Sequence, residues 1–191
     1  MERKLSKNNS GYSLVELLIV IAIIVVLASA AMLSYTMIHS ARAKDAAIKL
    51  NSEVNELKSR CMNMKPETAN HTYYALSLYT VDNTPHLCMV EFNSASNKYV
   101  YVEDTDINLS SSVKVDFDGT LCLENSTAGI DKTNYVPGGR SGSDATTTPV
   151  YICFDKRGNC YSGYGEYDFS KINGNVVSHV NIGMNGSISV R

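Results

Sequence analysis

The chain has 191 residues, which is enough for one domain plus an anchor, and its apolar fraction of 44% is ordinary for a globular protein. Its formal net charge of −2 provides no basic field, so the charge gives no argument for a nucleic-acid partner. Five cysteines stand at positions 61, 88, 122, 153 and 160 without a C-x-x-C pair, which argues against a structural zinc site.

Residues 1–11 form a short basic leader in which three basic side chains stand against one acidic side chain. A secretory signal peptide also begins with basic residues, but its apolar stretch comes before the small-residue cleavage site. Here the small residue, Gly11, comes before the apolar run. Cleavage after Gly11 would therefore remove only the leader and keep the apolar segment on the mature chain.

The apolar run begins directly after Glu16, and residues 17–41 carry no formal charge. A helix of this length covers about 37 Å, whereas the hydrocarbon core of a bilayer is about 30 Å thick. Length and composition alone predict a single-pass N-terminal anchor. An acidic residue within a membrane helix costs about 2.5–3.5 kcal/mol. We therefore expect Glu16 to have a partner.

The ten residues 11–20, GYSLVELLIV, resemble the processing and methylation motif of type IV prepilins and type II secretion pseudopilins. That motif is a Gly, an aromatic residue, a Ser or Thr, two aliphatic residues, a Glu and a long aliphatic run. The resemblance extends over about 25 residues, and its one departure is Tyr12, where Phe is commonest.

The resemblance implies a role for three residues. Gly11 would be the last leader residue, recognised by a membrane-embedded prepilin peptidase and methyltransferase, and Tyr12 would be the new, N-methylated N-terminus. Glu16 would neutralise the N-terminal amine of a neighbouring subunit during filament assembly, which offsets the cost of burying either charge alone. The implied partners are this peptidase, other pilin subunits, an inner-membrane assembly platform and the lipid bilayer.

The helical pattern continues through residues 42–65 with a different character. Apolar residues recur at steps of three and four, which predicts an amphipathic helix whose stripe packs against a globular body; a coiled-coil partner is the less favoured alternative. The residues of this stripe are Ala43, Ala47, Leu50, Val54, Leu57, Cys61 and Met64. Pro66 ends the pattern. We thus expect a membrane or filament-core helix over residues 12–41 and its continuation over residues 42–65.

Residues 66–191 form the predicted body, in which short segments rich in Val, Tyr and Thr alternate with turn residues. We expect strands at residues 72–81, 86–92, 98–103, 113–117, 121–124, 150–154, 159–164, 176–182 and 187–190. Because no second long helical pattern occurs, the predicted fold is α+β, with one long helix against an antiparallel sheet. Asp118-Gly119 and Asn185-Gly186 predict hairpin turns, and residues 129–149 predict a long surface loop.

One predicted hairpin contains two cysteines. A turn over residues 155–158 has Asp first and Gly fourth, as type I turns favour, and would place Cys153 opposite Cys160. Directly opposed Cβ atoms lie about 4.5–5.5 Å apart, so a cross-strand disulfide and a pair of free thiols both remain open. The segment 151–158 also resembles the F-D-x-R-G strand and turn of the H-type and FimT-like minor pseudopilins, which implies a place at the filament tip.

No metalloprotease, nucleophile-elbow or phosphate-binding motif occurs, so we predict no enzyme, no cofactor and no metal site. The favoured function is a structural subunit of an extracytoplasmic filament of the type IV pilus or type II secretion kind. The alternative is a single-pass anchored binding protein that does not assemble. In either case we expect a cytoplasmic-membrane anchor with the body outside; the filament hypothesis adds a cell-surface or periplasm-spanning filament. Pilus, competence and secretion machines, and major and minor subunits, all fit the resemblance.

Overall fold

The structure is a computed structural model that describes residues 13–63, 74–93, 98–102, 105–120, 150–172 and 174–191. Its contacts divide the chain into two compact units, Met1–Ile38 and His39–Arg191. The long helix α1 (Leu14–Asn63) contributes its first part to one unit and its second part to the other. The strands all belong to the second unit, and each unit is described by itself below.

Helix α1 begins directly after Ser13, whose carbonyl oxygen accepts the first helical hydrogen bond from the N–H of Leu17 at 3.1 Å. Ser13 and Glu16 have the spacing of a capping box, and an acidic side chain in the first turn suits the positive end of the helix dipole. No Gly or Pro interrupts the helix as far as Asn63. The predicted continuous helix is confirmed over Leu14–Asn63, and its expected last residues lie outside the described part.

The second part of α1 provides the centre of the hydrophobic core of the body. Seven of its side chains are buried: Ala43, Ala46, Ala47, Leu50, Val54, Leu57 and Cys61. The predicted apolar stripe is therefore confirmed for all its members except Met64, which lies outside the described residues. Burial of each of the leucines contributes about 1.5–3 kcal/mol relative to an exposed position. Separation of the helix from the sheets would expose this apolar stripe to water, so burial of the stripe holds the helix against the body.

The first sheet has the strand order β3-β2-β1-β6-β7, with β4 also paired to β2. Its strands are β1 (Tyr74–Val81), β2 (Thr84–Asn93), β3 (Lys98–Tyr101), β4 (Ile107–Asn108), β6 (Val150–Phe154) and β7 (Cys160–Ser162). One face, which includes Leu76 and Met89, shares the core with α1. The other face buries a second cluster that includes Ala75, Cys88 and Tyr151. The sheet is thus apolar on both faces, which explains why β1 reads as a nearly continuous apolar run.

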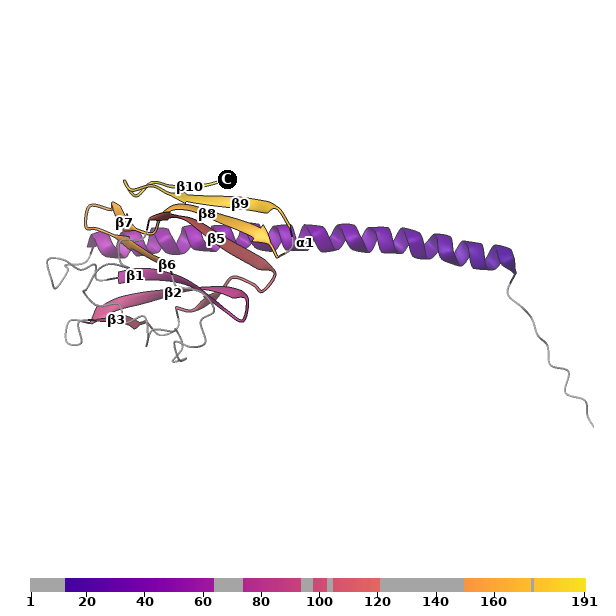
Figure 1. Ribbon diagram of the computed structural model, residues 1–191, viewed down its shortest axis with the longest axis horizontal. Coiled ribbons are helices and arrows are strands. Elements are labelled where there is room, and N and C mark those ends of the chain that lie inside the picture. Colours follow the sequence, from indigo (N-terminus) through magenta and orange to yellow (C-terminus); the bar gives the residue numbers. More distant parts are fainter. Residues whose placement is uncertain (1–12, 64–73, 94–97, 103–104, 121–149, 173) are drawn as a thin grey trace, which may run out of the picture. The chain divides into compact units, whose positions relative to one another are not determined.

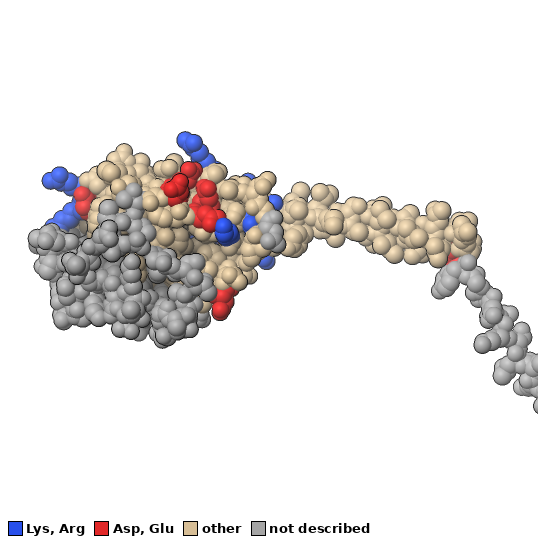
Figure 2. Space-filling model, viewed as in Figure 1, with Lys and Arg blue, Asp and Glu red and all other residues tan. Residues whose placement is uncertain are grey.

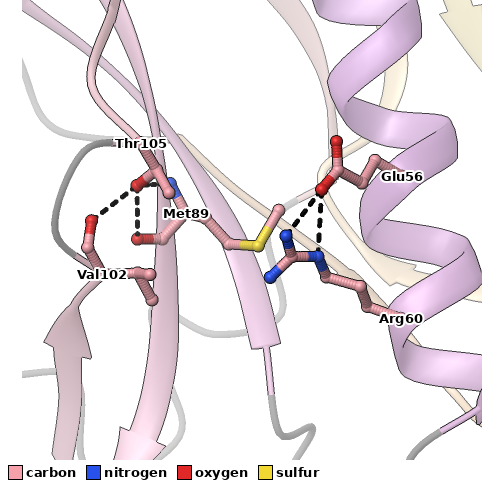
Figure 3. Close-up of polar contacts among 5 residues, drawn as sticks. All are labelled: Glu56, Arg60, Met89, Val102 and Thr105. Carbon is pink, nitrogen blue, oxygen red and sulfur yellow. Dashed lines mark hydrogen bonds and ion pairs between the residues drawn. The ribbon is translucent and has the colours of Figure 1, made fainter.

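Side-chain hydrogen bonds and one ion pair reinforce this sheet and the helix beside it (Figure 3). Thr105 Oγ1 accepts a hydrogen bond from the N–H of Met89 at 3.1 Å and donates one to the carbonyl oxygen of Val102 at 2.7 Å. On α1, Arg60 pairs with Glu56 at 2.7 Å, and its guanidinium carbon lies 5.7 Å from the centroid of the Tyr74 ring. Arg60 therefore contributes both an exposed ion pair and a cation–π contact to β1.

The second sheet has the order β10-β9-β8-β5 (Figure 1). Its strands are β5 (Val113–Thr120), β8 (Tyr164–Lys171), β9 (Val176–Ile182) and β10 (Ile188–Val190). Tyr167, Phe169 and Val180 point into the core that α1 shares, whereas Glu166, Asp168 and His179 between them are polar and not buried. All described strand pairings are antiparallel, so the predicted α+β fold with one long helix against antiparallel sheet is confirmed.

One predicted turn in this second sheet is wrong, one strand was not foreseen, and a second predicted turn is confirmed. Asp118-Gly119 is not a turn but lies within β5, where Gly119 is opposite Gly165 and the two backbones approach too closely for a Cβ atom. Strand β8 was not expected as a separate strand. The Asn185-Gly186 turn is confirmed: it joins β9 to β10, with Gly186 at a φ of 74°. The expected strand at residues 121–124 and the loop at residues 129–149 lie outside the described part.

The predicted position of Cys153 opposite Cys160 is also wrong. Phe154 is opposite Cys160 and Cys153 is opposite Ser162, because the turn spans Asp155 to Asn159 and is one residue longer than expected. A slip of one residue turns a side chain to the other face of a sheet. Cys153 accordingly lies in the second cluster and Cys160 in the main core. Cys153 and Cys160 are therefore not directly opposed in the sheet, and the choice between a disulfide and a pair of thiols at these positions stays a prediction.

Candidate functional site

The first candidate site is the apolar part of α1 that belongs to the first unit. Its large apolar side chains from Leu14 to Ile38 are 50% exposed or more. Its most apolar window has a mean hydropathy of 3.0. By length and composition this helix can cross a membrane. Figure 2 shows the segment without Lys or Arg and with an acidic side chain only at its start.

The polar side chains within this segment satisfy their hydrogen bonds inside the helix. Ser29 Oγ donates to the carbonyl oxygen of Val25 at 2.8 Å, and Ser34 Oγ donates to that of Ala30 at 3.1 Å. Such bonds allow hydroxyl groups to lie in hydrocarbon, where an unsatisfied polar group costs several kcal/mol. The segment is thus compatible with lipid along its whole uncharged length.

Glu16 is the exception, because its side chain is acidic, whereas residues 17–41 carry no formal charge. The side chain is exposed in the first helical turn, at the edge of the uncharged segment. Its spacing from Ser13 is that of a capping box, but a capping box does not require a charge, since Gln also serves at this position. The charge of Glu16 therefore calls for a further explanation. Gly11 and Tyr12, predicted as the cleavage and methylation sites, lie outside the described residues.

The F-D-x-R-G segment lies at the β6–β7 turn, far from Glu16 in sequence. The Asp155 carboxylate accepts hydrogen bonds from the backbone N–H groups of Arg157 and Asn159, each at 2.8 Å. Slight burial raises the pKa of Asp155, but the hydrogen bonds from Asn159 and Arg157 outweigh this effect and lower it. Gly158 has a φ of 82°, which favours glycine. Turn formation thus accounts for Asp155 and Gly158 without a role at a filament tip.

The structure brings together a second group of polar side chains, which the sequence analysis did not identify as a site. Glu166 and Asp168 on β8 converge on His179 of β9, and one ligand atom from each lies within 4.8 Å of the others. The signal was the alternation of polar residues with Tyr167 and Phe169, which marks β8 as a strand with one polar face. The pairing of Asp168 with His179, however, depends on the register between two strands and cannot be read from local spacing.

Comparison with known proteins gives one match. A family model described as the prokaryotic N-terminal methylation motif matches residues 6–32. This range contains Gly11, Glu16 and most of the uncharged segment, and the match supports a prepilin-like, type IV pilin or pseudopilin N-terminus. No curated protein and no solved structure matches the chain. Membrane anchoring is supported by the motif and by the apolar helix together.

Proposed function

We propose that the chain is a structural subunit of an extracytoplasmic filament of the type IV pilus or type II secretion kind. The observation that carries this proposal is Glu16, an acidic residue in the first turn of α1, at the edge of the largely exposed segment 17–41 that carries no formal charge and that begins within the matched motif. The proposed division is a leader at residues 1–11, a membrane or filament-core helix at 12–41, its amphipathic continuation at 42–65 and a body at 66–191.

Processing creates a positively charged partner for Glu16. A prepilin peptidase cleaves after Gly11, and methylation of the new N-terminus at Tyr12 follows. The resulting amine is positively charged and lies at the edge of the same apolar segment. Pairing of this amine with Glu16 of a neighbouring subunit removes two unpaired charges from an apolar environment at once, which neither charge achieves alone. It also fixes the axial position of one subunit relative to the next.

The two parts of α1 then have different tasks. The uncharged part, exposed in the single chain, packs in the bilayer before assembly and among other subunits afterwards. The apolar stripe between Ala43 and Cys61 is buried in the core of the body, to which both sheets contribute. The leader remains on the cytoplasmic side and the body lies outside. An inner-membrane platform is the expected site of assembly.

The alternative is an anchored binding protein that never assembles. An anchor needs an apolar span, but it needs neither a Gly before an aromatic residue nor a carboxylate in the first turn. The matched motif contains both features and therefore favours a filament subunit.

Isolation of surface or envelope filaments tests the proposal. Filaments sheared from cells and purified by density should contain the processed chain at a constant ratio to the other filament subunits. Recovery of the processed chain only with membranes, from cells that do make filaments, would favour the anchored alternative.

A further inference from the structure

The outer face of the second sheet carries an imidazole between two carboxylates. His179 lies directly opposite Asp168, and its Nδ1 is 2.6 Å from Asp168 Oδ1. The same Nδ1 is 3.2 Å from Glu166 Oε1. Figure 2 shows acidic side chains gathered over β5, β8 and β9. We propose that Glu166, Asp168 and His179 form a binding site for a divalent transition-metal ion, with Zn²⁺ as the best fit.

The donor set determines the choice of ion. Zn²⁺ binds imidazole nitrogen and carboxylate oxygen at about 2.0–2.2 Å, usually with tetrahedral geometry, so its neighbouring ligand atoms lie about 3.3 Å apart. The Nδ1–Glu166 separation of 3.2 Å is already close to this value, and the Nδ1–Asp168 separation of 2.6 Å has only to lengthen by about 0.7 Å for an ion to enter. Ca²⁺ and Mg²⁺ prefer sites made only of oxygen atoms. The imidazole therefore selects Zn²⁺ over these more abundant ions.

Two further acidic residues on β5 add negative charge beside these ligands, which favours binding of a cation. Asp116 of β5 lies directly opposite Asp168, and Asp118 lies directly opposite Glu166. Like charges at directly opposed positions destabilise a sheet. Asp116 has an ion pair with Lys114 at 2.7 Å, which leaves the other three carboxylates less well compensated. A divalent ion bound by Glu166 and Asp168 would reduce the repulsion among these carboxylates.

The ligands stand on a rigid support and remain accessible. Their strands are anchored from the opposite face by Tyr167, Phe169 and Val180, which are fully buried in the core. The side chains of His179, Glu166 and Asp168 are 42%, 51% and 37% exposed. An ion can thus enter without unfolding of the sheet, and three protein ligands leave at least one coordination position for water.

Titration of the full chain with ZnCl₂ tests the site. The metal-free protein is kept in detergent micelles, its accessible thiols are alkylated first, and binding is followed by calorimetry. We expect one Zn²⁺ per chain, and weaker binding of CaCl₂ by at least tenfold. His179→Gln should weaken Zn²⁺ binding at least tenfold, as should Asp168→Asn, while the circular-dichroism spectrum stays unchanged.

Asp118→Asn is the matched control, because it removes a charge from the same face without removing a ligand. It should change the Zn²⁺ affinity by less than about threefold. Unchanged affinity in both ligand variants would overturn the proposal. An equal loss in the Asp118 variant would also overturn it, because the face would then attract cations without a defined site. These outcomes are independent of filament assembly, so they leave the proposed function untouched.

Discussion

Lys58 of helix α1 donates a hydrogen bond from Nζ to the carbonyl oxygen of Gly186, 2.8 Å away in the β9–β10 turn. This bond links residues 128 positions apart in the sequence. The bond lies beside Gly158, where a side chain would be crowded: a Cβ atom at this position would lie 2.9 Å from the Lys58 side chain. Three distant segments thus meet at one point, and the polar contact complements the apolar stripe that docks the helix.

Replacement of Lys58 by Met should destabilise the body by about 1–2 kcal/mol, because the side-chain stem remains but the charged donor is lost. Urea unfolding of the full chain in micelles, followed by circular dichroism, measures the effect. Lys49→Met is the control: Lys49 forms only an exposed ion pair with Asp45, worth about 0.5 kcal/mol or less. Equal costs for the two variants would show that the Lys58 contact adds nothing.

Gly186→Ala should be more damaging, with a loss of at least about 2 kcal/mol of unfolding free energy. The φ of 74° disfavours a side chain, and a Cβ would collide with the backbone oxygen of Gly158. Gly174→Ala provides a comparison, since a Cβ there meets only side-chain carbons of Lys171 at 3.1 Å or more. A cost below 1 kcal/mol for the Gly186 variant would contradict the described packing of the turn.

Leu50→Ala should cost about 2–5 kcal/mol, because it opens a cavity at a fully buried position of α1. Ile48, two residues away on the same helix, is 60% exposed. Ile48→Ala should therefore change stability by less than about 1 kcal/mol in the same urea titration. If the two variants lost similar stability, the buried stripe would be assigned to the wrong face.

The buried thiols should react slowly in the folded chain. Burial raises the pKa of the Cys61 thiol to about 11, although hydrogen bonding with the backbone of Phe154 and Tyr74 opposes the shift. At pH 8 only about a thousandth of this thiol is ionised, so alkylation should be slow and should accelerate as the pH rises towards 11.

Denaturation without a reductant should then expose Cys61, Cys153 and Cys160 to full alkylation, as peptide mass mapping can show. Protection of both Cys153 and Cys160 in the denatured, unreduced chain would mean that they are disulfide-bonded, contrary to the register of β6 and β7.

Two substitutions separate the roles of Glu16. Glu16→Ala removes both the capping group and the charge, whereas Glu16→Gln keeps a residue suited to the capping box. Both variants should be processed nearly normally, yet both should be absent from filaments, because the uncharged side chain cannot neutralise an amine. Quantitative blotting of sheared filaments and membranes measures this. Normal assembly of the Gln variant would limit Glu16 to helix capping.

The helix was predictable because its signals are local. The run of uncharged residues and the spacing of Leu50, Val54 and Leu57 determine which parts are apolar and which face is buried. Most strands were predictable for the same reason, since β-branched and aromatic residues cluster between turn residues. The antiparallel arrangement follows from the absence of further long helical patterns.

The predictions that were wrong, and the features that were missed, depend on contacts between segments that are distant in the sequence. Gly119 indicates a turn in isolation, but within β5 it permits close approach to Gly165. The Asp155 turn is one residue longer than its sequence indicates, which moves Cys153 and Cys160 to opposite faces. His179 gains its carboxylate neighbours only through pairing of β8 with β9.

The mass of the intact mature chain tests the central claim most directly. The membrane and filament fractions of cells that express a functional prepilin peptidase are analysed by intact-protein mass spectrometry. We expect the chain to lack residues 1–11 and to carry one additional methyl group, which fragmentation places on the amine of Tyr12. A chain that retains its leader, or that is cut on the C-terminal side of the apolar segment, would contradict the account.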